Sequence, residues 1–232
     1  GEKLSIVTPK AQTTRNKITG ILTGKSYQII FLDTPGMLEP SYKLQEHMVN
    51  NAMKAASDAD LVILMVGSLN PPDEFEKALV QKIKDMKKKI ILVMNKIDKL
   101  PMKDDLLPLI ASYSQQFGFD DIVPISALKG NGVPRLLELV AEHLPEGQSL
   151  YPEDDISDLP ERFFIAEMVR EKIVLLTQQE MPYSTTVVAE EVKERKDGKI
   201  YIRASIYVER DSQKGILIGN KGAMLKRIGQ SA

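Results

Sequence analysis

Apolar residues in the first 145 positions form short runs of strand length, and amphipathic stretches separate these runs. The runs are rich in β-branched residues and predict strands at 27–32, 61–66, 90–94 and 122–125. The stretches between and after them predict helices at 42–57, 73–87, 104–117 and 134–144. Strands that are apolar throughout and alternate with helices are typical of a parallel sheet buried on both faces. We therefore predict a doubly wound α/β domain.

The pattern changes near residue 145. Three prolines and an acidic run occur between residues 144 and 160, which is typical of a linker. Beyond it we predict a helix at 160–178, strands at 184–195 and 199–209, a glycine-containing turn, and a helix from Gly222. Asp197-Gly198 between the two strands is a strong hairpin signal. The predicted organisation is an α/β domain at 1–145, a linker at 146–159 and a smaller α+β domain at 160–232.

Composition excludes several classes of protein. The chain has 232 residues, of which 43% are hydrophobic and 27% charged, as in globular proteins. Lysine and arginine number 31 against 32 acidic residues, so any binding to nucleic acid needs a local basic patch. The chain has no cysteine and its two histidines are far apart, which argues against a zinc site and favours the reducing cytoplasm. No apolar run approaches the roughly 20 residues that cross a bilayer.

The first candidate for chemistry is Asp33-Thr34-Pro35-Gly36, directly after a predicted strand. Ligands of doubly wound sheets bind beyond the carboxyl ends of the strands. At this place Asp33 is suited to hold Mg²⁺ through water, and Gly36 allows its backbone N–H to approach a terminal phosphate. The alternative is a Pro-Gly turn in which the aspartate bonds only its own backbone.

The second candidate, Asn95-Lys96-Ile97-Asp98, directly follows the predicted strand at 90–94. The carboxylate of Asp98 is suited to accept two parallel hydrogen bonds from guanine N1–H and the 2-amino group, a pair that adenine lacks. Asn95 is suited to bind the base and tie neighbouring loops together, and the stem of Lys96 to cover the ring. A solvated charged loop is the alternative. Ser126-Ala127-Leu128, after the fourth strand, offers a backbone N–H to the guanine carbonyl.

In this order the three motifs resemble those of translation-factor-class GTPases, and more closely those of the Era family of ribosome-assembly GTPases. The resemblance implies a sheet of the P-loop GTPase type that binds GTP or GDP with Mg²⁺. The segment from Lys10 to Arg15 resembles the first switch of that family, which implies that Thr14 ligates Mg²⁺ together with Asp33. The alternative is a polar loop in which Thr13 and Thr14 only cap a helix.

The second half of the family is an RNA-binding KH domain with a helix and hairpin ahead of a glycine loop, and the resemblance extends to Gly219-Asn220-Lys221-Gly222. Its two glycines leave room for a nucleic-acid backbone, and Lys221 supplies charge for a phosphate. Lys226 and Arg227 follow within a local excess of cations. The alternative is an ordinary turn before a solvated basic helix.

The chain departs from the family pattern in three respects. The motif Gly-x-x-x-x-Gly-Lys-Ser/Thr does not occur in these residues, and we expect it upstream, because Gly1-Glu2-Lys3-Leu4 resembles the stretch after the first helix of the family. We expect the KH-type domain to be truncated as well, short of the final strand and helix of the family. Met37 occupies the position of a water-orienting glutamine in Ras-like GTPases, so no catalytic residue is assigned.

The motifs and the resemblance to the Era family together imply a GTP-binding and hydrolysing switch that binds small-subunit ribosomal RNA and assists assembly of the small ribosomal subunit. In a fragment without the phosphate-binding loop, nucleotide binding is expected to be impaired. We expect a cytoplasmic monomer, and peripheral membrane association is left open. One alternative is an RNA-binding module whose α/β half is structural and binds no nucleotide. The other is a different GTPase without an RNA function.

Overall fold

The computed structural model describes residues 3–8, 10, 13–41, 43–67, 70–119, 121–177, 181 and 184–232. The chain forms two compact units. The first unit comprises Gly1–Thr23, Ile30–Gly36 and Tyr151–Ala232, and the second comprises Gly24–Ile29 and Met37–Leu150. The division into domains at 1–145, 146–159 and 160–232 stays a prediction.

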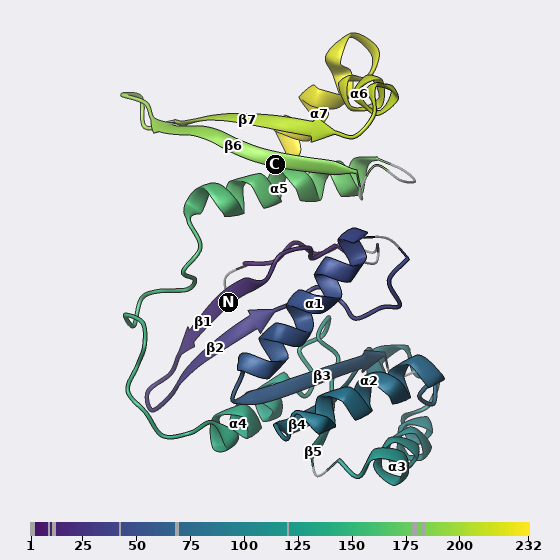
Figure 1. Ribbon diagram of the computed structural model, residues 1–232. Coiled ribbons are helices and arrows are strands. Elements are labelled where there is room, and N and C mark those ends of the chain that lie inside the picture. Colours follow the sequence, from purple (N-terminus) through teal and green to yellow (C-terminus); the bar gives the residue numbers. More distant parts are fainter. Residues whose placement is uncertain are drawn as a thin grey trace. The chain divides into compact units, whose positions relative to one another are not determined.

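The second unit contains a parallel sheet of three strands in the order β3-β4-β5 (Figure 1). The strands are β3 (Leu61–Gly67), β4 (Lys89–Asn95) and β5 (Asp121–Pro124). Leu64 lies opposite Leu92, and Val93 lies opposite Val123. The α-helices are α1 (Lys43–Asp58), α2 (Glu74–Asp85), α3 (Leu106–Phe117) and α4 (Val133–His143), and two 3-10 turns lie at η1 (Ile97–Lys99) and η2 (Lys103–Asp105). The predicted alternation of parallel strands and helices is confirmed for these three strands, whereas the predicted strand at 27–32 pairs outside this sheet.

The core of the second unit explains why its strands are apolar without alternation. Ile91 and Val93 on one face of β4, and Leu92 and Met94 on the other, are all fully buried. Leu64 and Leu92 belong to a cluster that includes Val80 and Ile83 of α2 and Tyr113 of α3. Because both faces of β4 are covered, the predicted doubly wound fold class is confirmed.

Strand β1 (Ile18–Thr23) was not predicted from the sequence. It forms a two-stranded sheet with β2 (Gln28–Asp33), which lies within one residue of the predicted strand at 27–32. Gly20 lies inside β1, and an internal glycine weakens a strand signal. The predicted linker runs along this strand, since Ile21 N–H donates to Ile156 O at 2.8 Å and Ser157 Oγ to Thr19 O at 2.5 Å.

The remaining part of the first unit has an α+β arrangement (Figure 1). Its elements are α5 (Glu161–Leu176), β6 (Thr185–Glu194), β7 (Ile200–Val208), α6 (Asp211–Ile218), η3 (Asn220–Gly222) and α7 (Ala223–Ser231). Strands β6 and β7 are antiparallel, which confirms the predicted hairpin. Helix α6 was missed because Gly215 lies in its middle, and glycine disfavours helices. Ile173 of α5, Leu217 of α6 and Ile228 of α7 share one buried cluster.

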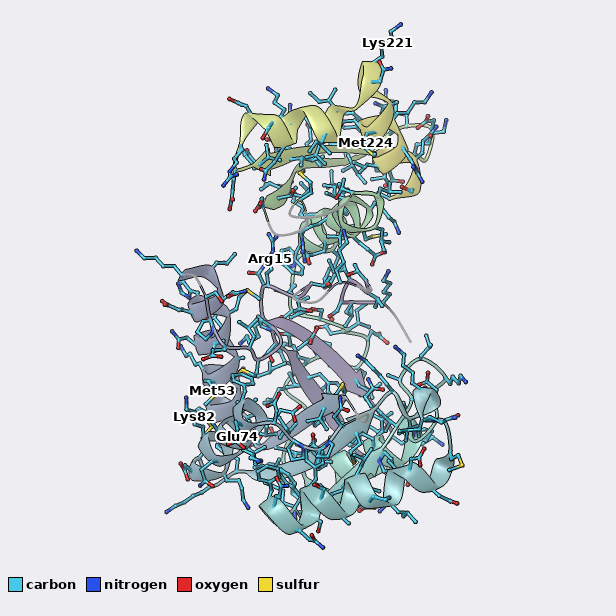
Figure 2. The ribbon with its side chains drawn as sticks, turned by 90° about the vertical axis from the view of Figure 1, so that its right-hand side faces the viewer. Arg15, Met53, Glu74, Lys82, Lys221 and Met224 are labelled. Carbon is cyan, nitrogen blue, oxygen red and sulfur yellow. The ribbon has the colours of Figure 1, made fainter. Side chains whose placement is uncertain are left out.

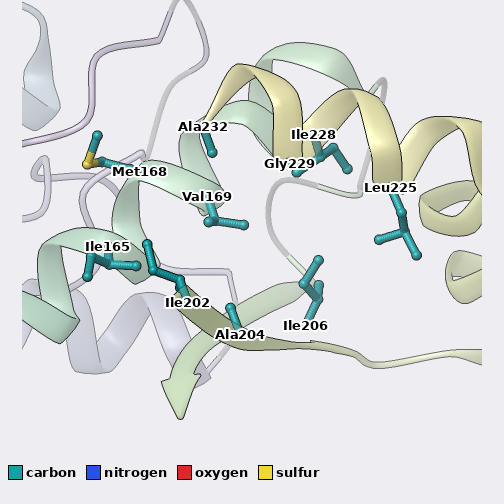
Figure 3. Close-up of a pocket in the computed structure, with 10 residues that line it drawn as sticks. All are labelled: Ile165, Met168, Val169, Ile202, Ala204, Ile206, Leu225, Ile228, Gly229 and Ala232. Atoms are coloured by element: carbon teal, nitrogen blue, oxygen red, sulfur yellow. The ribbon is translucent and has the colours of Figure 1, made fainter. Parts of the chain in front are cut away.

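An apolar groove with a volume of about 330 Å³ lies in this unit (Figure 3). Its walls include Ile165 and Val169 of α5, Ile202 and Ile206 of β7, and Leu225 of α7. None of the side chains that line it is polar, so the groove has no hydrogen-bonding side chain to orient a polar ligand. Within the part of the chain that the structure describes, no helix combines the length and apolarity that a bilayer crossing requires.

Candidate functional site

The ends of β4 and β5 bring two of the predicted motifs together. Ile125 N–H donates to Met94 O at 2.8 Å, and Ile97 N–H donates to Ile125 O at 3.2 Å. Lys96 has a left-handed backbone with φ 68°, which turns the chain sharply from β4 into η1. The loops at 95–98 and 126–128 therefore lie side by side at the carboxyl edge of the parallel sheet.

The carboxylate of Asp98 is fixed by a neighbour from the other loop. Ser126, which is fully buried, donates a hydrogen bond of 2.6 Å from Oγ to Asp98 Oδ1. This bond, together with Lys129 and Lys99, holds the pKa of Asp98 below its usual range, although partial burial opposes the shift. Asp98 is thus a carboxylate at neutral pH, and Ser126 fixes one of its two oxygens.

Asn95 joins the same two loops from the β4 side. Its Oδ1 accepts from Lys96 N–H at 2.7 Å and from Ala127 N–H at 3.0 Å. The Ser126 N–H donates to Asn131 O at 2.9 Å, so it is directed into the protein. Lys96 is exposed, and Leu128 is 85% exposed. The structure thus collects Asn95, Asp98, Ser126 and Ala127 in one small site, with two exposed side chains beside it.

Gly132, at the start of α4, allows the second loop to close tightly. A Cβ at this position would lie 2.4 Å from Pro124 O, and its φ of +76° is in the region that favours glycine. The end of β5 and the first turn of α4 can therefore approach each other closely enough to shape the loop at 126–128.

The predicted phosphate and magnesium residues belong to the first unit. Asp33 is exposed and accepts a hydrogen bond of 2.6 Å from Ser5 Oγ to its Oδ2. A Cβ on Gly36 would meet no atom within 4 Å, so protein packing does not require a glycine there. Thr14 is half-buried, whereas Ala11 and Gln12 of the same motif lie outside the described residues.

The side-chain oxygens of Asp33 and Thr14 are of a type that can bind Mg²⁺ together with phosphate oxygens. Asp33 and Thr14 supply carboxylate and hydroxyl oxygens, which are the hard ligands that this ion prefers. Among the described residues, no group of three or more histidine, cysteine, aspartate or glutamate side chains is arranged so that it could hold a metal ion. Mg²⁺ is commonly held by one or two protein oxygens, with phosphates and water completing its shell, so this sparse donor set is suitable.

The glycine loop of the first unit has an unusual backbone. Gly219, Lys221 and Gly222 have φ angles of 69°, 50° and 81°. A Cβ on Gly219 would lie 2.8 Å from Met224 Cβ and 2.9 Å from Met224 N, so only glycine fits between the loop and α7. Figure 2 shows Lys221 pointing outward from the tip of this loop and Met224 below it. The loop therefore presents backbone and a cation to solvent.

The side chains predicted to bind RNA at the loop and on α7 are accessible to solvent. Asn220, Lys221, Lys226 and Arg227 are exposed. In the described part of the chain, no carboxylate forms an ion pair with Lys221, Lys226 or Arg227. Arg203 is different, because its Nε lies 3.1 Å from Glu190. The cations at the loop thus keep their charge available for an anionic ligand.

Sequence reasoning missed two charged side chains, Arg170 and Glu171, that are buried on α5. Glu171 contacts Lys3, and Arg170 contacts Thr13, the residue before Thr14; both partners are more than 150 residues earlier in the chain. The sequence signal for these two residues was weak, because arginine and glutamate in a helix usually lie on its solvent-exposed face.

The chain is similar to known proteins over both units. A family of 50S ribosome-binding GTPases matches residues 1–96, and the KH-domain family matches residues 180–232. A solved structure of Aquifex aeolicus Era bound to GDP·AlF4⁻ is 40% identical with a TM-score of 0.94, and the match covers 99% of this chain and 78% of that one. A structure of Era in complex with MgGDPNP and nucleotides 1506–1542 of 16S ribosomal RNA gives the same values.

Both matches to solved Era structures extend over nearly the whole chain. The GTPase-family match includes β1 to β4, and the KH-family match includes β6 to α7. With 40% identity over 99% of its length, the chain belongs to the Era family of GTPases.

Proposed function

We propose that this protein is a GTP-binding and hydrolysing switch that binds small-subunit ribosomal RNA. The observation that carries the proposal is the 2.6 Å hydrogen bond by which Ser126 fixes Asp98 beside Asn95. A fixed carboxylate at the carboxyl edge of a parallel sheet is suited to recognise the adjacent N1–H and 2-amino donors of guanine. Adenine presents no such pair, so the site selects guanine nucleotides.

The phosphate end of the nucleotide would be held by other residues. Asp33 and Thr14 would supply oxygens to Mg²⁺, and Gly36 leaves space for its N–H to meet the terminal phosphate. When bound, Mg²⁺ supplies positive charge that neutralises the phosphate oxygens. Water would attack the γ-phosphate, the bond from the γ-phosphorus to the β–γ bridging oxygen would break, and GDP and inorganic phosphate would be released. This chain would contribute position and charge rather than a covalent intermediate.

The glycine loop would bind the RNA backbone. Phosphates can approach Gly219 and Gly222 closely, and Lys221, Lys226 and Arg227 would neutralise them. The Era complex with a 16S ribosomal RNA segment supports small-subunit RNA as the partner class. We further propose a role in assembly of the small ribosomal subunit by a cytoplasmic monomer, since a GTP switch on its RNA suits a transient assembly factor.

Nucleotide and RNA binding by the full-length protein test this function. The protein used must carry a phosphate-binding loop, because that motif does not occur in the 232 residues. We expect Mg²⁺-dependent binding of a fluorescent GTP analogue that excess GTP displaces and excess ATP does not. A 16S RNA fragment equivalent to nucleotides 1506–1542 should bind more tightly than a scrambled fragment of equal length. RNA binding without any guanine-nucleotide binding would instead favour an RNA-binding module with a structural α/β half.

A further inference from the structure

Two adjacent side chains of opposite charge are buried on α5. The side chain of Arg170 is 5% exposed and that of Glu171 is 4% exposed. Removing either charge from water is costly unless partners replace the lost hydration. Both side chains find such partners in residues 3–13 of the same unit, which lie next to the predicted magnesium ligand Thr14.

Glu171 holds the beginning of this segment. Its Oε2 accepts from Lys3 Nζ at 2.5 Å and from Val7 N–H at 3.2 Å, and its Oε1 accepts from Lys172 Nζ at 3.0 Å. Burial raises the pKa of Glu171, but these hydrogen bonds outweigh burial and hold the pKa below its usual range. Glu171 is therefore a buried carboxylate that stays charged because the segment is docked on it.

Arg170 holds the end of the segment, next to Thr14. Its Nη2 donates to Thr13 O at 2.8 Å, while Nε and Nη2 donate to Glu167 at 2.6 and 2.5 Å. Because the contact is to the main-chain oxygen of Thr13, it sets the course of the backbone immediately before Thr14. The carboxylate of Glu167 fixes the guanidinium on α5 and keeps its orientation.

Two further hydrogen bonds are made by residues on either side of Thr13 and Thr14. Lys10 Nζ donates to Thr177 O at 2.7 Å, and Arg15 Nη1 donates to Thr185 O at 2.9 Å. The segment is thus held on both sides of Thr14 by residues of α5 and of the chain that follows it. All these contacts lie within the first unit.

The same helix shares a buried core with the two helices that flank the glycine loop. Ile173 of α5 belongs to one buried cluster with Leu217 of α6 and Ile228 of α7. Helix α6 ends just before Gly219, and α7 begins just after Gly222. Helix α5 therefore contacts the segment before Thr14 through its charged pair, and shares an apolar core with the helices on either side of the glycine loop.

We propose that Arg170 and Glu171 are positioning residues that hold the Thr14 segment on α5 in the arrangement that Mg²⁺ and the γ-phosphate require. This inference rests on the proposed function, in which Thr14 ligates Mg²⁺. A segment that is already docked loses less conformational freedom when GTP binds, so docking favours the GTP state over the GDP state. Linkage is reciprocal, so RNA that stabilises α5 and its neighbours favours GTP to the same degree that GTP favours RNA.

The test compares variants of the full-length protein. Arg170→Ala removes the contact to Thr13, and Arg162→Ala is the matched control, an exposed arginine on the same helix. Affinities for GDPNP with Mg²⁺ and for GDP are measured, together with affinity for the 16S RNA fragment in both nucleotide states. Thermal unfolding of each variant shows whether it is folded. If Arg170→Ala does not fold, Glu171→Gln, which keeps the size and removes the charge, takes its place.

In Arg170→Ala we expect GDPNP affinity to fall by about fivefold or more while GDP affinity stays unchanged. The ratio of RNA affinities in the two nucleotide states should approach one, and Arg162→Ala should behave as the wild type. The inference is overturned if a folded Arg170→Ala or Glu171→Gln variant keeps two wild-type ratios: that of GDPNP affinity to GDP affinity, and that of the RNA affinities in the two nucleotide states. A wild type whose RNA affinity is the same in both states also overturns it. A wild type that binds no guanine nucleotide overturns the proposed function itself.

Discussion

Ser126 donates a hydrogen bond of 2.6 Å from Oγ to Asp98 Oδ1, so the loop after β5 orients the carboxylate that follows β4. The two residues are 28 positions apart, and they meet because β4 and β5 are parallel neighbours that end at one edge. The proposed base-binding site is therefore assembled by strand pairing. Asp98, after β4, supplies the negative charge, and Ser126, after β5, fixes the orientation of the carboxylate.

Asp98→Asn in the full-length protein is expected to shift preference from guanine to xanthine nucleotides. An amide replaces one acceptor by a donor, which suits the additional carbonyl of xanthine. Loss of the charge-assisted pair should weaken GTP binding by about 1.5–3 kcal/mol. Competition between GTP and XTP for a fluorescent analogue measures the shift. Asp104→Asn, at an exposed aspartate of η2, is the control, and unchanged GTP affinity in Asp98→Asn would remove Asp98 from the base site.

The 232-residue chain by itself is expected to bind GTP and GDP weakly or not at all. Backbone N–H groups and the lysine of a phosphate-binding loop hold the β-phosphate, and that motif does not occur in these residues. Titration of a fluorescent GDP analogue with this chain measures the affinity. Micromolar binding would show that other residues hold the phosphates.

Changing both Asn220 and Lys221 to aspartate is expected to weaken RNA binding by about tenfold or more, or about 1.4 kcal/mol. The variant adds repulsion toward phosphates while both glycines remain, and the salt dependence of binding should flatten. A filter or mobility-shift titration of the 16S fragment measures this at several salt concentrations. The control carries Asn51→Asp and Lys54→Asp, the same two exchanges at exposed positions of α1. Equal losses in both variants would mean that the loop has no special role.

Intrinsic GTP hydrolysis by the full-length protein is expected to be slow, roughly 10⁻⁴ to 10⁻² per second, and to rise when RNA or small subunits bind. Met37 packs against the buried cluster that contains Leu64 and Leu92, and a thioether is a poor partner for an attacking water. Met37→Ala should therefore change the single-turnover rate by less than about threefold. Fast turnover that drops in Met37→Ala would contradict this view of Met37.

Tyr113→Phe is expected to lower the stability of the second unit by about 0.5–1.5 kcal/mol near neutral pH. Tyr113 is fully buried, and its hydroxyl donates to Glu76 Oε2 at 3.0 Å. Burial, with Glu76 and Asp73 nearby, raises the pKa of Tyr113 far above its usual value of 10.0. The stabilisation is therefore complete below that value and is lost as pH rises above it toward the pKa of the folded state.

Urea unfolding of the wild type and Tyr113→Phe, between about pH 8 and pH 11, measures this difference. The stability of the wild type should fall more steeply above the usual tyrosine pKa than that of the variant. Tyr207→Phe removes an exposed hydroxyl and should follow the wild type. Parallel curves for the wild type and Tyr113→Phe would show that the phenol does not stay protonated through burial.

The strands of the parallel sheet were predictable because Ile91, Leu92, Val93 and Met94 are buried on both faces, which leaves an unbroken apolar run in the sequence. The motif residues Asn95 and Asp98 were predictable for the same reason, since they follow such a run. Strand β1 and helix α6 were missed because glycine interrupts each of them. The contact between Arg170 and Thr13 joins residues 157 positions apart. Patterns of apolar and polar residues predict local helices and strands, so they cannot predict a contact of this kind.

The close approach of Gly219 to Met224 limits which positions of the glycine loop can be changed to alter RNA preference. The missing Cβ of Gly219 lets the loop rest against Met224, so every other residue at 219 would displace the first turn of α7. Randomised libraries should therefore keep 219 constant and vary 220 and 221, which are exposed. Clones with a changed residue 219 would lose foldability before any change in ligand preference could be selected.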